Sequence, residues 1–81
     1  MEPVTLTARQ REVLLLLACG MTEAQIADKL HISEHTVHTH HKNINKAMKA
    51  HCLIELIGKA LYYQCFTLQD WFCALASNSL L

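Results

Sequence analysis

The spacing of apolar residues along the chain is helical rather than alternating. A first helix is predicted to begin after Thr7 and to run to about residue 19, because Thr7 followed by Gln10 is a capping-box pattern in which each side chain satisfies a free backbone N–H of the first turn. Gly20 suits the end of this helix, since glycine adopts positive φ at little cost. The inward stripe of the helix consists of Val13, Leu14 and Leu17.

A second, shorter helix follows almost immediately. Thr22 and Gln25 repeat the capping box, and the helical pattern ends near Leu30. Ser33 is an N-cap candidate only three residues later, so the connection to the next helix is a tight turn. Two helices joined in this way have the spacing of a helix-turn-helix motif.

The third predicted helix, about residues 34–49, contains no glycine or proline and separates into two faces. The face expected in the core carries Val37, Ile44 and Met48. The opposite face carries His35, His38, Thr39, Lys42 and Lys46. No acidic residue lies between Glu34 and Glu55, so this stretch is a local basic patch in a chain whose formal net charge is zero. Such a stripe is typical of a solvated surface or of a contact with a polyanion.

The last third of the chain has more apolar surface than one core can use. A fourth helix, about residues 53–64, is apolar almost all round, and a fifth is predicted to begin at Thr67 with Asp70 as its capping partner. The apolar stripe of the fifth helix consists of Leu68, Trp71, Phe72 and Leu75. Surplus apolar surface of this kind favours a dimer.

Length and composition limit the class of protein. At 81 residues, of which 52% are apolar, the chain has room for a single domain with a modest core. The longest apolar run, residues 13–21, is far shorter than the ~20 residues of a membrane-spanning helix. The four cysteines form no Cys-x-x-Cys pair, which favours free thiols in a reducing compartment over a zinc or disulfide scaffold. These features together favour a cytoplasmic protein without a membrane segment.

Enzymatic and metal-dependent functions have little support. The sequence offers no glycine-rich phosphate loop, no paired carboxylates and no nucleophile with an evident base and orienting group, so we expect neither catalysis nor a cofactor. Histidines spaced three or four apart are compatible with a metal-responsive regulator, although no cysteine or carboxylate other than Glu34 completes the set locally. These histidines are His31, His35, His38 and His41.

The order and spacing of the helical signals resemble the LuxR/FixJ/GerE-type helix-turn-helix family over residues 6 to about 60. Each signal is common by itself, but the whole series is specific. The matching residues are Leu6-Thr7, Arg9, Glu12-Val13-Leu14, Gly20, Ile26-Ala27, Leu30, Ile32-Ser33, Thr36-Val37, His40, Asn43-Ile44 and Glu55.

The resemblance implies an all-α, four-helix DNA-binding domain, which we place at residues 1–65. The fifth predicted helix then forms a helical extension at 66–81. It implies a transcription regulator whose third helix lies in the major groove of double-stranded DNA and whose fourth helix forms a two-fold dimer contact. The residues expected at the DNA are Ser33, His35, Thr36, His38, Thr39, Lys42 and Lys46. Those expected at the dimer contact are Ile54, Leu56, Ala60, Tyr63, Trp71 and Phe72. RNA polymerase and another regulator are further candidate partners.

Several positions depart from the family pattern. His38 and His41 stand where Lys and Arg are common, Ala47 where a second Lys is usual, and Leu53 where a basic residue is frequent. Fewer permanent cations predict weaker phosphate binding. His31 replaces the glycine of the turn, a substitution that histidine tolerates with some strain.

These departures leave an alternative open. The chain would then be an interaction protein that keeps the dimer helix, binds DNA poorly, and silences a full-length relative by pairing with it. Only five residues precede Leu6, which favours a stand-alone domain over a fragment of a larger regulator.

Overall fold

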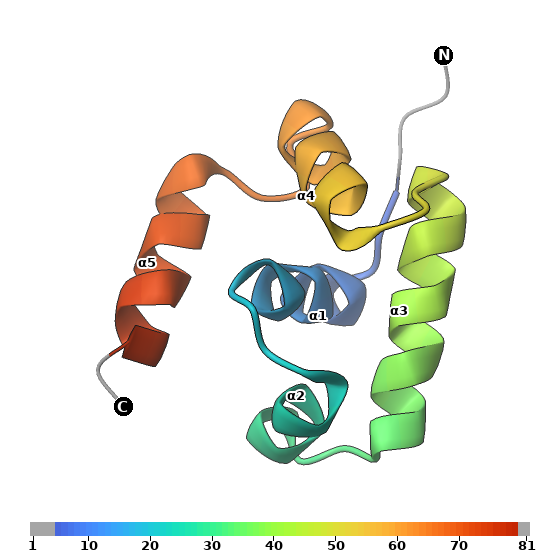
Figure 1. The fold of residues 1–81 in the computed structure, drawn as a ribbon, viewed down its shortest axis with the longest axis vertical. Coiled ribbons are helices and arrows are strands. Elements are labelled where there is room, and N and C mark those ends of the chain that lie inside the picture. The colour runs from blue at the N-terminus through green and yellow to red at the C-terminus, as the bar shows by residue number, and fades with distance from the viewer. Residues whose placement is uncertain (1–4, 80–81) are drawn as a thin grey trace.

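The computed structural model describes residues 5–79, apart from the side chains at positions 78–79, as five α-helices (Figure 1). They are α1 Ala8–Ala18, α2 Glu23–Leu30, α3 Glu34–Met48, α4 Leu53–Tyr62 and α5 Leu68–Ser79. The all-α architecture with an extra C-terminal helix is thereby confirmed. No helix in the described range is long and apolar enough to cross a membrane.

The capping boxes determine where three of the helices begin. In α1, Thr7 Oγ1 accepts from the N–H of Gln10 at 3.1 Å, and the N–H of Thr7 donates to Gln10 Oε1 at 3.0 Å. Thr22 and Gln25 make the same reciprocal pair at the start of α2. The residue pair Thr67–Asp70 repeats it at α5. These local signals therefore form the hydrogen bonds that the sequence predicts.

Residues with positive φ terminate four of the five helices. Gly20 follows α1 with φ 85°, and His31 ends α2 with φ 57°, as expected from its place in the turn. Lys49 ends α3 with φ 54°. Gln64 has φ 59°, and the N–H of Cys65 closes the turn on Ala60 O at 2.8 Å, so α4 ends at Tyr62, two residues before the predicted limit.

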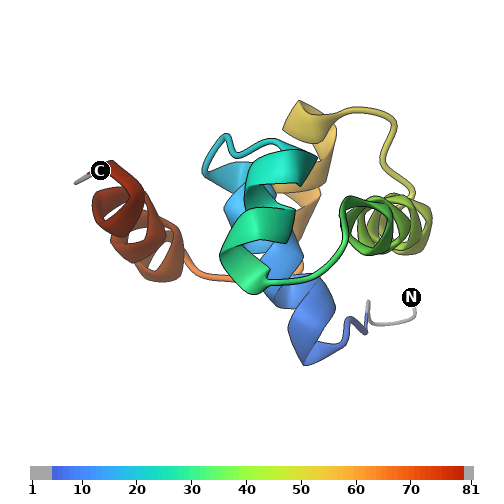
Figure 2. The same cartoon turned by 90° about the horizontal axis from the view of Figure 1, so that it is seen from below.

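The core is built around α1, which lies in the middle of the other four helices in both views (Figures 1 and 2). α1 therefore buries residues on most of its circumference, Val13, Leu14, Leu16, Leu17 and Ala18. α2, α3 and α4 contribute Ile26, Ala27, Val37, Ile44, Met48, Leu56 and Ala60. α1 thus contacts each of the other four helices, with α3 on one side of it and α5 on the other.

The C-terminal helix α5 packs against α1 rather than over α4. Phe66, which leads into α5, is only 6% exposed, and Trp71 donates its Nε1–H to Ala18 O at 2.9 Å. The two rings meet edge to face with centroids 6.2 Å apart. Trp71 is thus held against its own chain and is half-buried there, and its assignment to the dimer contact stays a prediction.

Two of the residues predicted at the dimer contact lie inside the core. Leu56 and Ala60 are both 0% exposed and belong to the core, because α4 turns this side toward α1 and α3. Tyr63 is half-buried against the core and lies edge to face with Tyr62. Of the six predicted residues, only Ile54 and Phe72 are strongly exposed, at 85% and 74%. The sequence pattern failed here because a helix that is apolar all round does not reveal which side faces inward.

Candidate nucleic-acid interface

α3 presents one full face to solvent. Figures 1 and 2 show it at the margin of the molecule, with α1, α2 and α4 all on one side of it and α5 beyond α1. Its buried residues are Val37, Ile44 and Met48, and its exposed residues include His35, His38, Thr39, Lys42 and Lys46. The predicted division of α3 into a core face and a polar face is therefore present, and α5 does not cover the polar face.

The first turn of α3 is closed by hydroxyl groups. Ser33 Oγ accepts from the N–H of Thr36 at 3.0 Å and shares a hydrogen bond of 2.7 Å with Thr36 Oγ1. These two hydroxyls are engaged with each other, so a phosphate at this position would be held mainly by backbone N–H groups of the first turn. Glu34 is exposed in the same turn and adds a negative charge there.

Thr39 has its side chain fixed by the helix itself. Its Oγ1 donates to His35 O at 3.0 Å, which leaves the lone pairs of the hydroxyl oxygen for outside donors. Thr39 is therefore presented as an acceptor in the middle of the exposed face.

Lys42 and Lys46 carry charges that are available to a ligand. Both side chains are exposed, and no ion pair to either is found within residues 5–79. An unneutralised ammonium on a flexible stem is suited to a phosphate oxygen or to an acceptor on a base edge.

An acidic residue, which the sequence analysis did not connect with this face, lies beside it. Glu23 is the first residue of α2, and its carboxylate lies 3.2 Å, at both oxygens, from His38 Nδ1. The second oxygen, Oε2, is also 2.9 Å from His41 Nδ1. The hydrogen bond from His41 is the main cause that lowers the pKa of Glu23 below its usual value of 4.5, with burial opposing it and His38 adding to it. Glu23 is therefore ionised at neutral pH.

Only part of the histidine series is gathered in space. His38 and His41 meet at Glu23, whereas His31 and His35 are exposed without a hydrogen bond to that carboxylate. Among residues 5–79 no group of three metal-ligating side chains has the arrangement of a metal site. His40 is half-buried on α3.

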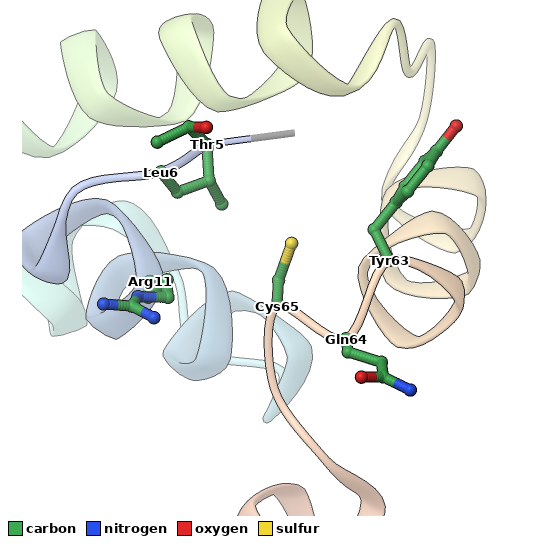
Figure 3. A pocket seen from close by; sticks show the side chains of 6 residues that line it. All are labelled: Thr5, Leu6, Arg11, Tyr63, Gln64 and Cys65. Atoms are coloured by element: carbon green, nitrogen blue, oxygen red, sulfur yellow. The ribbon is translucent and has the colours of Figure 1, made fainter. Parts of the chain in front are cut away.

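A shallow pocket of about 290 Å³ lies on another part of the surface, where the start of α1 meets the end of α4 (Figure 3). Its lining residues are Thr5, Leu6, Arg11, Tyr63, Gln64 and Cys65. Burial raises the pKa of the Cys65 thiol, against a smaller opposing effect of Arg11. A thiol with a raised pKa is a poor nucleophile at neutral pH, so this environment does not activate Cys65.

Residues 4–60 match the family described as bacterial regulatory proteins, luxR family. The matched range includes α1, α2 and α3 and most of α4, and leaves α5 outside.

Individual proteins of this kind are also similar to the chain. It is 48% identical over 56 residues to the uncharacterized response regulatory protein YgeK of Escherichia coli, a match covering 69% of the chain and 38% of the relative. It is 50% identical over 48 residues to the quorum-sensing regulator RhlR of Pseudomonas aeruginosa, covering 59% and 20%. It is 40% identical over 57 residues to the transcriptional regulatory protein FixJ of Rhizobium meliloti, covering 70% and 28%. The chain thus spans well under half the length of these relatives.

Proposed function

Because the chain belongs to the luxR family of bacterial regulatory proteins, it is a DNA-binding helix-turn-helix domain of a transcription regulator, and we propose that it binds a specific duplex sequence through α3. The observation that carries the proposal is the exposed, unpaired pair Lys42 and Lys46 on the face of α3 that points away from the core.

The side chains on this face would bind different parts of the DNA, according to their chemistry. His38, Thr39 and Lys42 face the groove and contact base edges, where hydrogen bonds specify sequence. Lys46, one turn further along, neutralises a phosphate. At the start of α3 the backbone N–H groups of Glu34 and His35 hold a second phosphate. His35 borders this position on the exposed side.

We also propose that two copies associate through α4, in keeping with an operator of two half-sites. Ile54, Gly58 and Tyr62 stand at i, i+4 and i+8 on one face of α4, and all three are exposed. The 85% exposure of Ile54 supports this contact, since exposing a large aliphatic side chain to water costs free energy that burial against a second copy would recover. Phe72 on α5 lies outside this stripe and is not needed for it.

The first test compares two variants that each lose one positive charge. Lys42→Ala is expected to weaken specific binding by about 1 to 3 kcal/mol, because it removes a contact to a base edge or a close phosphate. Arg9→Ala is the matched control, since Arg9 lies on α1 and pairs with Glu12 at 3.4 Å. Affinity is measured by titration at fixed low salt, with folding checked by circular dichroism. Equal effects of the two substitutions would contradict the assignment of α3.

A second candidate function is an interaction protein that pairs with a full-length relative and binds DNA poorly. Two acidic residues beside the recognition face, Glu23 and Glu34, favour it because they oppose phosphate binding. A gel-shift with random genomic fragments separates the two functions: the antagonist retards no fragment at protein concentrations at which it already forms a complex with its relative.

A further inference from the structure

The contact between α2 and α3 determines where the ring hydrogens of two histidines lie. An ionised carboxylate only accepts hydrogen bonds. Glu23 faces Nδ1 of His38 at 3.2 Å and Nδ1 of His41 at 2.9 Å, so each Nδ1 carries the hydrogen. A neutral imidazole has one N–H, so in the neutral rings Nε2 is left as an acceptor.

The two histidines differ in what they present to solvent. The His38 side chain is 57% exposed, whereas that of His41 is 27% exposed and lies closer to the carboxylate. His41 therefore serves as the second anchor that holds Glu23 in place. His38 keeps an accessible edge, and its Nε2 is directed away from the carboxylate that holds Nδ1.

We propose that Glu23 is a positioning residue that makes neutral His38 an acceptor toward the DNA, and thereby selects a base with a donor at that position. The proposal rests on the proposed function, in which His38 faces the major groove. Cytosine N4 and adenine N6 offer such a donor there, whereas guanine offers only the acceptors N7 and O6. Without Glu23 the ring is free to carry its hydrogen on Nε2 and to donate it to N7 or O6 of guanine.

The Glu23 arrangement is specific to a carboxylate. Oε2 of Glu23 accepts from both rings and Oε1 also accepts from His38, whereas a glutamine has an N–H₂ at one of these two positions that would face an N–H. The same substitution also removes a negative charge from the surface, and this second effect raises affinity for every duplex alike. Base preference, rather than affinity, is therefore the property that isolates the positioning role.

The first experiment needs no DNA. Long-range proton–nitrogen spectra of the free protein at about pH 8 identify which ring nitrogen carries the hydrogen. We expect the Nδ1–H form for His38 in the wild type, a shift toward the Nε2–H form in Glu23→Ala, and the wild-type pattern in Asp28→Ala. Asp28 is an exposed acid on the same helix, outside the contact with His38, and so controls for loss of charge. An Nε2–H wild type, or a Glu23→Ala variant that keeps the Nδ1–H form, overturns the proposal.

The second experiment selects duplexes from a random library at the same pH. We expect the wild type and Asp28→Ala to prefer cytosine or adenine over guanine at one position of the half-site. In Glu23→Ala this preference is expected to fall about 3- to 10-fold, as for the loss of one hydrogen bond. In a His38→Ala background the Glu23 substitution is expected to leave the preferences unchanged.

The two experiments separate failure of the inference from failure of the function. If the wild type selects a sequence whose preferences survive in Glu23→Ala, the inference is wrong and the proposed function stands. If the wild type selects no sequence, the proposed function is wrong. The role of His38 at the DNA is then wrong as well, whichever ring nitrogen carries the hydrogen.

Discussion

Trp71 of α5 donates a hydrogen bond to the end of α1, and replacing it tests how α5 is attached to the rest of the domain. Trp71→Phe keeps an aromatic ring against Phe66 but removes the Nε1–H that donates to Ala18 O. Ala18 is the last residue of α1, so its carbonyl has no partner within that helix. The indole therefore caps the C-terminus of α1 from a residue that lies 53 positions away in sequence.

The expected loss of stability in Trp71→Phe follows from the burial of the Ala18 carbonyl. Ala18 is 8% exposed, so its carbonyl gains little from water once the indole is gone. Leaving a buried acceptor unsatisfied costs about 1 to 2 kcal/mol. For a domain of this size, each kcal/mol of lost stability lowers Tm by about 4 to 8 °C. Trp71→Ala adds the loss of the contact with Phe66 and is expected to cost about 2 to 3 kcal/mol.

The assay is urea and thermal denaturation followed by circular dichroism. Phe72→Ala is the matched control, because Phe72 is the next residue of α5 but is 74% exposed, and its loss is expected to change the free energy of unfolding by less than about 0.5 kcal/mol. If Phe72→Ala destabilised the protein and Trp71→Phe did not, α5 would be attached by the opposite face. That result would refute the packing described above.

Two further predictions concern charge and association. Glu23→Gln is expected to lower the free energy of unfolding by about 1 kcal/mol at neutral pH. Since the folded state lowers the pKa of Glu23, that contribution is present above its usual value of 4.5 and is lost as pH falls through the lowered value, so the two proteins should converge in stability only at pH values below 4.5. Ile54→Asp is expected to shift the sedimentation profile toward monomer, whereas Leu68→Asp, an exposed apolar position on α5, is not; equal shifts would contradict a contact through α4.

The sequence determined the elements whose signals are local. A capping box such as Thr7 with Gln10 spans one turn of chain, so the residues that form its hydrogen bonds are already neighbours before any tertiary contact forms. His31 in the left-handed conformation likewise follows from a tight turn between two N-cap signals. The exposed face of α3 was predictable for the same reason, since residues three and four apart share a side of a helix.

Only the tertiary structure decided which residues from different helices meet. Glu23 lies 15 residues before His38, and no pattern in the sequence joins them; their contact depends on how α2 crosses α3. In the same way Leu56 and Trp71 were both predicted at a dimer contact, and only the tertiary structure shows that Leu56 is buried in the core and that Trp71 is hydrogen-bonded to α1. Helical periodicity assigns a residue to a side of its own helix, but the rotation of one helix against another is set by packing of the whole core, which is why these contacts could not be derived from the sequence.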